Sequence, residues 1–286
     1  MCYINEIKGL KFNPYIPPKP LPALAGDVAY WDGSKVKTTP LSNWNTSLGI
    51  AIGVVVVPEG FAPDGKVRIV SLMGVDRNGN QSSSHVNMTW GGYDIDDTEI
   101  TRFVLVPTTD NAGSTSAGSN GTGYLPSDKF TGAQSFIDPK AKYFGVTPYV
   151  PSPYLGEDPN PEYYKELNRG NVLSDFNGLS NTQTLVGLGS DCEAANAAWK
   201  FNDGASALQW YLPAMGELGY IMPRFNEINT TITALGGITI NNEEYKYHWS
   251  STYVGLFDVI CLKCNDGFIN LQMLDANQYT RPFAMI

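Results

Sequence analysis

The sequence is poor in charged residues. Only 16% of its 286 residues are Asp, Glu, Lys or Arg, and the formal net charge is -9. The 19 basic residues form no run, whereas a phosphate-binding face needs clustered Lys and Arg. This absence argues against nucleic acid as a partner. A surface with so little charge relies on Asn, Ser, Thr, Gly and Tyr, a composition that suits extracellular and sugar-binding proteins.

Long apolar runs are also missing. No segment approaches the ~18 to 20 apolar residues of a membrane span. The first ten residues, Met1 to Leu10, have neither the basic start nor the apolar stretch of a secretory leader. We therefore expect no membrane insertion, and we expect synthesis in the cytoplasm followed by release inside a larger particle such as a virion.

Cysteine and histidine are scarce. The four cysteines, Cys2, Cys192, Cys261 and Cys264, are too few to organise a chain of this size by disulfides. Cys261 and Cys264 have the spacing of a zinc knuckle or redox pair, but the second half of a zinc site is missing. In a strand, positions three apart point to opposite faces. We expect no metal, no cofactor and no catalytic residue here.

Apolar β-branched runs predict a core of strands. Strands are expected in the segments 26–33, 50–57, 67–73 and 100–106, with a Pro- and Gly-containing loop at 58–66 between two paired strands. A polar loop follows at 108–123, and the aromatic, Pro-rich stretch from Tyr124 to Asp175 is interpreted as an insertion with a short helix near 162–167. The insertion as a whole covers about 107–175.

Helical signals become stronger after residue 189. Ser190 and Glu193 fit a capping box that starts a helix running to Trp199. Pro213 is expected to start a second helix ending near Met222, and Pro223 a third that ends at Gly236-Gly237. The third helix should bury one face, formed by Phe225, Ile228, Ile232 and Leu235. The segment 245–283 is expected to form short strands around the turn Asn265-Asp266-Gly267.

Residues 1–25 are interpreted as an extended arm. Repeated prolines fix the backbone and remove amide donors, which favours an extended, polyproline-like chain. The arm carries apolar side chains spaced to dock into grooves on another chain: Phe12, Tyr15, Ile16, Leu21 and Leu24. The domain itself is expected to span 26–286, and the alternative is that the arm packs along this domain.

A series of short motifs follows in a recognisable order. They are Gly26-Asp-Val-Ala-Tyr-Trp-Asp-Gly33, Asn181-Thr182, Cys192-Glu-Ala-Ala195, Trp210-Tyr-Leu-Pro213 with Glu217-Leu218, Trp249-Ser-Ser-Thr252, Asn265-Asp-Gly267 and Arg281-Pro-Phe283. In this order they resemble the fibrobacter-type (FISUMP) and DUF1566 domains, weakly before residue 176 and well after it. The resemblance implies an α+β, C-type-lectin-like fold related to the formylglycine-generating enzyme scaffold.

The resemblance also implies a function. Such domains occur in bacterial surface proteins and in fibre or receptor-binding proteins of phages. The predicted function is a non-enzymatic virion surface protein, a head or tail fibre or decoration protein, mounted by its arm on capsid, tail or fibre proteins and forming a homotrimer. The alternatives are a bacterial cell-surface adhesin and an enzyme on the formylglycine-generating scaffold. Cys261 and Cys264 do not sit in the surrounding motif of that enzyme branch.

Several landmark residues are interpreted as scaffold. Trp210, Leu212 and Trp249 are expected in the core, each indole with a partner for its N–H. Arg281 is expected to pair with a buried carboxylate such as Glu217. Ser250, Ser251 and Thr252 are expected to satisfy backbone groups, and His248 is expected to be a packed residue rather than a base.

The region after Trp249 is the predicted binding surface. Rings and amides on one face supply the stacking and directed hydrogen bonds that sugar recognition requires, so a host-surface glycan is the expected ligand. The alternatives are a merely solvated edge and a contact with another subunit. Acidic stretches at 94–99 and 157–158 are interpreted as solvated loops, since they lack a calcium-loop pattern. The candidate positions are Tyr253, Phe257, Asp258, Phe268, Asn270, Gln272, Asp275, Asn277, Gln278 and Tyr279.

Overall fold

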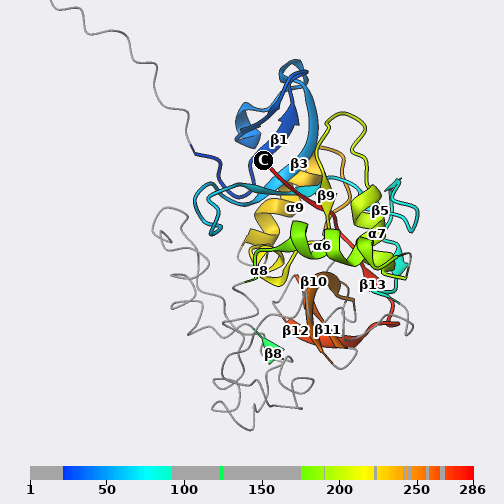
Figure 1. Ribbon diagram of the computed structural model, residues 1–286. Coiled ribbons are helices and arrows are strands. Elements are labelled where there is room, and N and C mark those ends of the chain that lie inside the picture. Colours follow the sequence, from blue (N-terminus) through cyan, green and yellow to red (C-terminus); the bar gives the residue numbers. More distant parts are fainter. Residues whose placement is uncertain are drawn as a thin grey trace, which may run out of the picture.

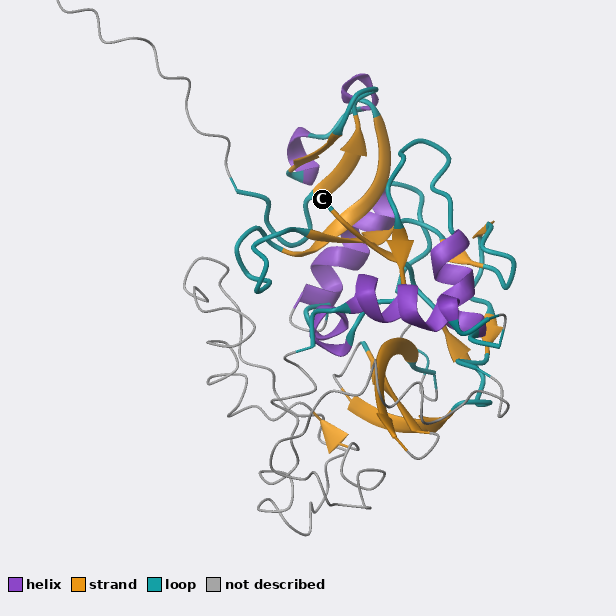
Figure 2. Ribbon diagram, viewed as in Figure 1, coloured by secondary structure: helices purple, strands orange, loops and turns teal. Residues whose placement is uncertain are grey.

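The chain adopts an α+β fold, which confirms the class expected from the sequence. Two six-stranded sheets lie on either side of short helices, which cross the middle of the molecule (Figures 1 and 2). None of the helices in the described part of the chain is long and apolar enough to cross a membrane. The computed structural model describes residues 22–91, 123–124, 175–189, 191–221, 224–240, 243, 246–255, 258–264 and 268–286.

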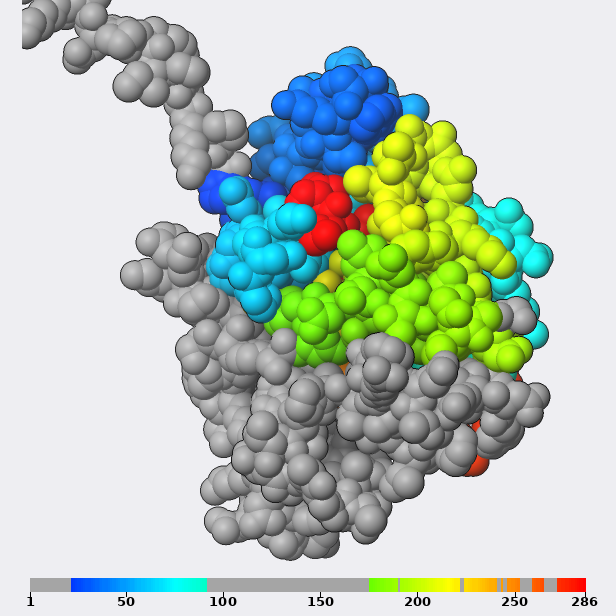
Figure 3. Space-filling view, in the orientation of Figure 1, coloured from blue at the N-terminus to red at the C-terminus, as the bar shows by residue number. Residues whose placement is uncertain are grey.

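The first sheet brings together the two ends of the described chain. Its strand order is β2-β1-β3-β4-β14-β9, and each neighbouring pair is antiparallel. In the space-filling view the last residues, in red, lie between N-terminal segments in blue and a later segment in yellow (Figure 3). The strands are β1 (Val28–Trp31), β2 (Val36–Thr39), β3 (Ile50–Val57), β4 (Arg68–Ser71), β9 (Trp210–Tyr211) and β14 (Phe283–Met285).

Strand β3 is buried on both faces, which explains its continuous apolar sequence. Val55 packs in one core cluster and Val54 in the other. The partner β4 pairs antiparallel with it, with Val54 opposite Val70. The expected strands at 50–57 and 67–73, their pairing and the loop between them are therefore confirmed.

The second sheet has the order β7-β13-β10-β11-β12-β8. Only the β10–β13 pair is parallel among its described pairings. The expected strands of the segment 245–283 are thus confirmed, while the turn at 265–267 lies outside the described residues. The strands are β7 (Asn87–Met88), β8 (Gly123–Tyr124), β10 (His248–Gly255), β11 (Asp258–Lys263), β12 (Phe268–Met273) and β13 (Gln278–Tyr279).

Smaller elements decorate the first half of the chain. Strands β5 (Gly74–Val75) and β6 (Gln81–Ser82) form a hairpin. Two 3-10 turns, Leu41–Asn43 and Thr46–Leu48, join β2 to β3. The expected strand at 100–106, the loop at 108–122, most of the 107–175 insertion with its helix near 162–167, and the acidic stretches lie outside the described residues.

The described part of the chain contains the α-helices α6 (Gly178–Gly187), α7 (Glu193–Lys200), α8 (Met215–Gly219) and α9 (Phe225–Ala234). Helix α9 confirms its prediction: Ile228 and Ile232 are buried, and Gly236, with φ 75°, follows its end. Helix α8 is shorter than the expected 213–222. Helix α6 was not predicted from the sequence.

The expected capping box of α7 is wrong. The residue that caps its N-terminus is Cys192, whose side chain makes no capping hydrogen bond. The Glu193 carboxylate instead accepts hydrogen bonds from the backbone N–H of Thr89 at 2.7 Å and from its hydroxyl at 2.9 Å. A carboxylate in the first turn still favours the helix by its charge, but here it also ties α7 to the segment before residue 91.

Candidate functional site

The three residues Ser250, Ser251 and Thr252 of β10 hold both ends of the long segment 92–174. Before that segment, the indole N–H of Trp90 donates to the carbonyl of Ser250 at 2.8 Å. After it, the Thr252 hydroxyl donates to Oδ2 of Asp175 at 2.8 Å. All three residues are fully buried. Trp90 and Asp175, which flank residues 92–174 closely, are therefore both bonded to one strand.

A buried amide completes this arrangement. Asn181 of α6 donates from Nδ2 to Asp175 Oδ2 at 3.0 Å and to the Ser251 hydroxyl at 3.3 Å. Asp175 Oδ1 accepts from the backbone N–H of Asn177 at 2.9 Å, just before α6 begins. Buried polar groups are costly unless they are paired, so these contacts fix where the segment returns.

The same strand is tied to the start of α8. The Thr252 hydroxyl accepts from the backbone N–H of Met215 at 2.8 Å, and the backbone N–H of Ser251 donates to Pro213 O at 2.8 Å. The Ser250 hydroxyl donates to Ile260 O at 2.6 Å. The expectation that these three side chains satisfy backbone groups is confirmed for Ser250 and Thr252.

Three tryptophans form the rigid centre of the molecule. Trp90, Trp210 and Trp249 are almost fully buried. The indole of Trp249 donates to Met88 O at 2.9 Å, and that of Trp210 donates to Asp203 Oδ2 at 3.0 Å. The core placement expected for Trp210, Leu212 and Trp249 is confirmed. Trp90 was missed, although a large aromatic residue between polar neighbours is itself a signal of an anchor.

The expected ion pair between Arg281 and Glu217 is wrong. Glu217 accepts from Nε of Arg68 at 2.7 Å, from the hydroxyl of Tyr211 at 3.0 Å and from the backbone N–H of Ala214 at 2.9 Å. Burial raises the pKa of the Glu217 carboxyl to about 7, against the opposing effect of Arg68. The ion pair joins β4 to α8 and is completely buried.

Arg281 is stabilised by backbone carbonyls instead. Its Nε and Nη2 donate to Ser71 O at 3.1 and 2.7 Å, and Nη2 also donates to Leu72 O at 2.8 Å and Ile238 O at 2.6 Å. A guanidinium has five donors and can therefore bond several carbonyls at once. Arg281 therefore joins three segments rather than neutralising a carboxylate.

His248 and the cysteines are part of the core. His248 is 1% exposed, and burial, with the nearby His85 and Arg281, lowers its pKa to about 3. Its Nδ1 lies 3.5 Å from Cys264 Sγ. Cys261 and Cys264 pack in different core clusters on opposite sides of the sheet, as the spacing predicted. Among the described residues no group of three His, Cys, Asp or Glu is arranged to hold a metal ion.

The predicted binding surface maps onto neighbouring strands. Tyr253 lies in β10, Asp258 in β11, and Phe268 and Asn270 in β12, paired through Tyr253↔Val259, Asp258↔Met273 and Cys261↔Asn270. The side chains of these four residues, and Phe257 as a whole, lie outside the described part of the structure. The backbone therefore brings these positions to one sheet.

The turn from β12 to β13 supplies the described part of this surface. Gln272 is partly exposed, and Asp275 and Asn277 are exposed. Met273, which was not predicted, is 52% exposed beside them. We call Gln272, Met273, Asp275 and Asn277 the display turn. Amides, a carboxylate and a thioether lie in sequence here, and they can bind a polar ligand with an apolar patch.

Gln278 and Tyr279 do not belong to this surface, because both are buried in β13. Oε1 of Gln278 accepts from the backbone N–H of Tyr247 at 2.9 Å, and the Tyr279 hydroxyl donates to Glu243 Oε2 at 3.1 Å. Strand β13 lies between β7 and β10, and both of its side chains are at most 7% exposed.

Strand β8 lies beside the predicted surface. Tyr124 pairs with Phe268 and Gly123 with Ile269, so a strand from within the 107–175 insertion forms the outer edge next to β12. Sequence reasoning placed the insertion and the surface in separate regions. The pairing places β8 against the first residues of β12, whereas the display turn follows from the last residues of that strand.

The end of the N-terminal arm packs on the body. Ala23 and Ala25 are buried, and Leu24 is 39% exposed. The other candidate attachment residues, Phe12, Tyr15, Ile16 and Leu21, lie outside the described residues. The body therefore begins a few residues before the expected boundary at 25/26.

Comparisons with known proteins show no family for this chain. No family model matches the chain, and no curated protein matches it. Among solved structures, a fimbrial protein from Bacteroides ovatus superposes with a TM-score of 0.41 and 13% sequence identity. The alignment covers 92% of this chain and 49% of that one, so this chain spans about half the length of the fimbrial protein. At this level of likeness two proteins need not share a fold.

Proposed function

We propose that this chain is a non-enzymatic surface protein of a tailed-phage virion, a head or tail fibre or decoration protein. A C-type-lectin-like domain of the FISUMP and DUF1566 kind displays a binding face at one end, and the N-terminal arm attaches the protein to capsid, tail or other fibre proteins. The expected ligand is a host-surface glycan, and the expected assembly is a homotrimer.

The observation that carries this proposal is the buried triplet Ser250-Ser251-Thr252. It fixes both ends of the 92–174 segment through Trp90 and Asp175. The same strand leads into β11 and β12, beside which β8 of the insertion is paired. Function in loops held by a rigid scaffold is the usual arrangement for recognition proteins.

The described reactive groups support a binding role over catalysis. A general base must reach its substrate proton and titrate near the working pH, whereas His248 is buried with a pKa of about 3. Cys261 and Cys264 face opposite sides of β11 and are fully buried. Burial also raises the pKa of Cys192 to about 12, which suppresses its thiolate.

A glycan array tests the binding role. The full chain, labelled on lysine, is expected to bind a restricted set of glycans and to release no product from them. Binding to none of them, or conversion of a bound glycan, would overturn the proposed function.

Labelling of particles tests the location. An antibody against the full chain is expected to decorate phage particles from the native source in electron micrographs. Label confined to the bacterial envelope would show a cell-surface adhesin instead.

A further inference from the structure

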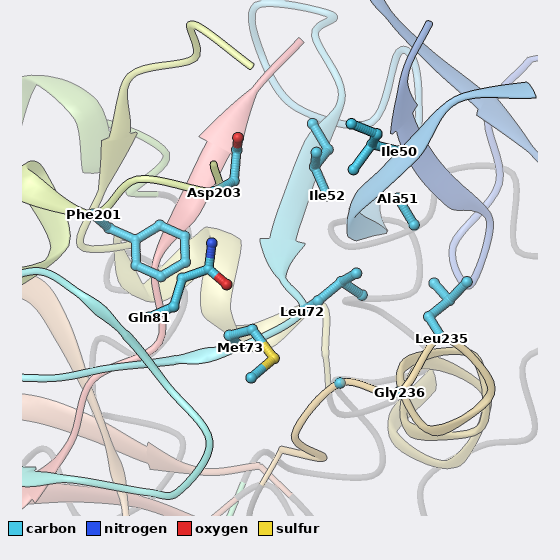
Figure 4. Close-up of a pocket in the computed structure, with 11 residues that line it drawn as sticks. Ile50, Ala51, Ile52, Leu72, Met73, Gln81, Phe201, Asp203, Leu235 and Gly236 are labelled. Atoms are coloured by element: carbon cyan, nitrogen blue, oxygen red, sulfur yellow. The ribbon is translucent and has the colours of Figure 1, made fainter. Parts of the chain in front are cut away.

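An apolar groove of about 270 Å³ opens beside the start of β3, away from the display turn (Figure 4). Ile50 and Leu235 lie on one side of it, and Phe201 and Gln81 on the other, with Met73 between them. Ile50 is 56% exposed, the highest value among the large apolar side chains of the described residues. A groove with such a rim is suited to an apolar segment of another chain.

The groove also borders an open sheet edge. Strand β1 pairs with β3 as far as Ile50, whereas the described pairing of β4 with β3 stops at Gly53↔Ser71. The chain leaves the sheet at Leu72, whose carbonyl accepts from the backbone N–H of Ile238 and from Arg281, each at 2.8 Å. Residues 50–52 therefore have a described strand neighbour on one side only. An exposed edge of this kind can add an extended peptide as a further strand.

We propose that this groove binds the N-terminal segment, residues 1–21, of a second copy of the chain. The segment is Pro-rich from residue 14 onward, which favours an extended backbone that can lie along a groove, and residues 1–13 contain no proline and so keep the amide donors that strand addition requires. It carries Phe12, Tyr15, Ile16 and Leu21 as apolar side chains for the groove. This interaction does not depend on what the display turn binds, and it gives the segment a partner other than the capsid, tail or fibre proteins of the proposed function.

The net charges of residues 1–21 and of the remaining chain support this segment as the one that binds the groove. Residues 1–21 contain three lysines and one glutamate, whereas the whole chain has a net charge of -9. The segment and the remaining chain therefore carry opposite net charges, and such charges steer association. The Asp203 carboxylate lies on the groove wall, where it accepts from Trp210 Nε1 and from the backbone N–H of Ala205.

The point where the segment leaves the body favours a second copy over the same molecule. Gly26 donates from its N–H to Val55 O at 2.9 Å, and its carbonyl accepts from the Thr231 hydroxyl at 2.8 Å. These contacts are on the β1 side of β3 and toward its C-terminal end, whereas the groove is on the β4 side at the N-terminal end. The described chain therefore begins on the opposite side of β3 from the groove.

The length of the segment is sufficient for exchange. Fully extended, 21 residues span roughly 70 Å, enough to reach a neighbouring body. A contact between an arm on one copy and a groove on the next is head-to-tail, and it closes into a ring when the rotation permits. The inferred contact thus supplies a means of forming the proposed trimer.

Disulfide trapping tests the inference directly. In a Cys2→Ser background of the full chain, Tyr15→Cys is combined with Ile50→Cys, and the matched control combines Tyr15→Cys with Gln183→Cys on the exposed face of α6. The native Cys192, Cys261 and Cys264 are buried and do not compete. Mild oxidation is expected to give covalent dimers and higher multimers with the Ile50 pair, at least about tenfold above the control, a free-energy difference of about 1.4 kcal/mol.

Two outcomes of this experiment would overturn the proposal that the groove binds residues 1–21 of a second copy. Trapping no greater than in the Gln183 control would show that the groove does not bind the segment. Linkage found only within single chains, by mass spectrometry of the joined peptides, would show that each segment occupies its own groove.

A second variant guards against a misleading result from the introduced cysteines. Ile50→Asp places a charge in the groove at a position already exposed to solvent, so the fold should be unaffected. Its self-association, measured by sedimentation equilibrium, is expected to weaken about tenfold or more with an unchanged melting temperature. Association as strong as that of Gln183→Asp would contradict the proposal.

Discussion

At the scale of single residues, the body depends on a few buried charges whose partners are far away in the sequence. Arg68 and Glu217 are separated by 149 positions, and Arg281 lies 210 positions from Ser71. The sequence predicts that Glu217 and Arg281 need partners but not which ones. Arg68 lies at the edge of a β-branched run, where a solvent-facing side chain would be expected, so its role depends on tertiary packing.

Removing Glu217 should be far more harmful than removing Asp64, although both contact Arg68. Glu217→Ala leaves a buried guanidinium and the Tyr211 hydroxyl without this acceptor, and should lower the free energy of unfolding by about 3 kcal/mol. Asp64 is 41% exposed, so Asp64→Ala should cost at most about 1 kcal/mol. Urea unfolding of the two variants checks this, and equal losses would contradict it.

His248 should make stability depend on pH in mildly acid solution. Its pKa is lowered from 6.5 to about 3 in the folded chain, so below pH 6.5 the unfolded chain binds a proton that the folded chain does not. The contribution of neutral His248 to the free energy of unfolding is complete above pH 6.5. It is lost as the pH falls toward 3, by about 1.4 kcal/mol per pH unit.

The free energy of unfolding is therefore expected to fall by about 1 kcal/mol more between pH 7 and 5.5 in the natural chain than in His248→Asn. Urea unfolding at the two pH values measures the difference. The same slope in both proteins would show that His248 does not carry this dependence.

At the scale of elements, the sequence predicts those strands and helices whose formation depends on a local apolar pattern. Strands β3 and β4 have continuous apolar runs, and α9 has an apolar face and a glycine stop. Helix α6 has no such signal, because its sequence, Gly-Leu-Ser-Asn-Thr-Gln-Thr-Leu-Val-Gly, contains few strong helix formers. Its place depends on tertiary contacts, among them Asn181 with Asp175 and the Thr182 hydroxyl with Leu212 O at 3.0 Å.

Two glycines of α6 should respond oppositely to alanine. A Cβ at Gly178 would lie 2.1 Å from Glu217 Oε2 and 2.7 Å from the backbone nitrogen of Ala214, whereas a Cβ at Gly187 would meet nothing within 4 Å. Alanine is favoured over glycine in helices by about 1 kcal/mol. Gly178→Ala should nevertheless destabilise by about 2 kcal/mol or more, and Gly187→Ala should be neutral or slightly stabilising.

Thermal unfolding of the two glycine variants provides the measurement. If Gly178→Ala melted at or above the temperature of the natural chain, the close packing of α6 against α8 would be refuted.

Thr252 should control how firmly the body holds residue 175. Thr252→Val removes the acceptor for the Met215 N–H and the donor to Asp175, and should cost about 2 kcal/mol. Hydrogen exchange at Gly216, whose N–H donates to Asp175 O, should accelerate. The control Thr230→Val, on an exposed face of α9, should leave that exchange unchanged. Equal rates in both variants would contradict the anchoring role.

At the scale of the whole molecule, the proposed function makes one end a frame and the other a display surface. The frame could be predicted in part, because large apolar landmarks such as Trp210 and Trp249 have few alternatives to burial. The surface could be predicted only as a region. Local alternation does not reveal that Gln278 and Tyr279 are buried through contacts with Tyr247 and Glu243, which lie more than 30 positions away in the sequence.

The pairing of β8 with β12 could not have been found from local patterns. Tyr124 and Phe268 are far apart in the sequence, and the segments between them carry no signal of register. The groove beside Ile50 was likewise invisible, since it arises where β4 leaves the sheet while β3 continues.

The most direct test of the central claim is the affinity of the full chain for its best glycan from the array, measured by biolayer interferometry. Asp275→Ala combined with Asn277→Ala should raise Kd about tenfold or more, about 1.4 kcal/mol, without lowering the melting temperature. The control pair Ser42→Ala and Asn43→Ala, equally exposed but on the first 3-10 turn, should leave Kd unchanged. An unaltered Kd in the display-turn variant, or the same loss in the control, would contradict the claim that this frame displays its binding face at the display turn.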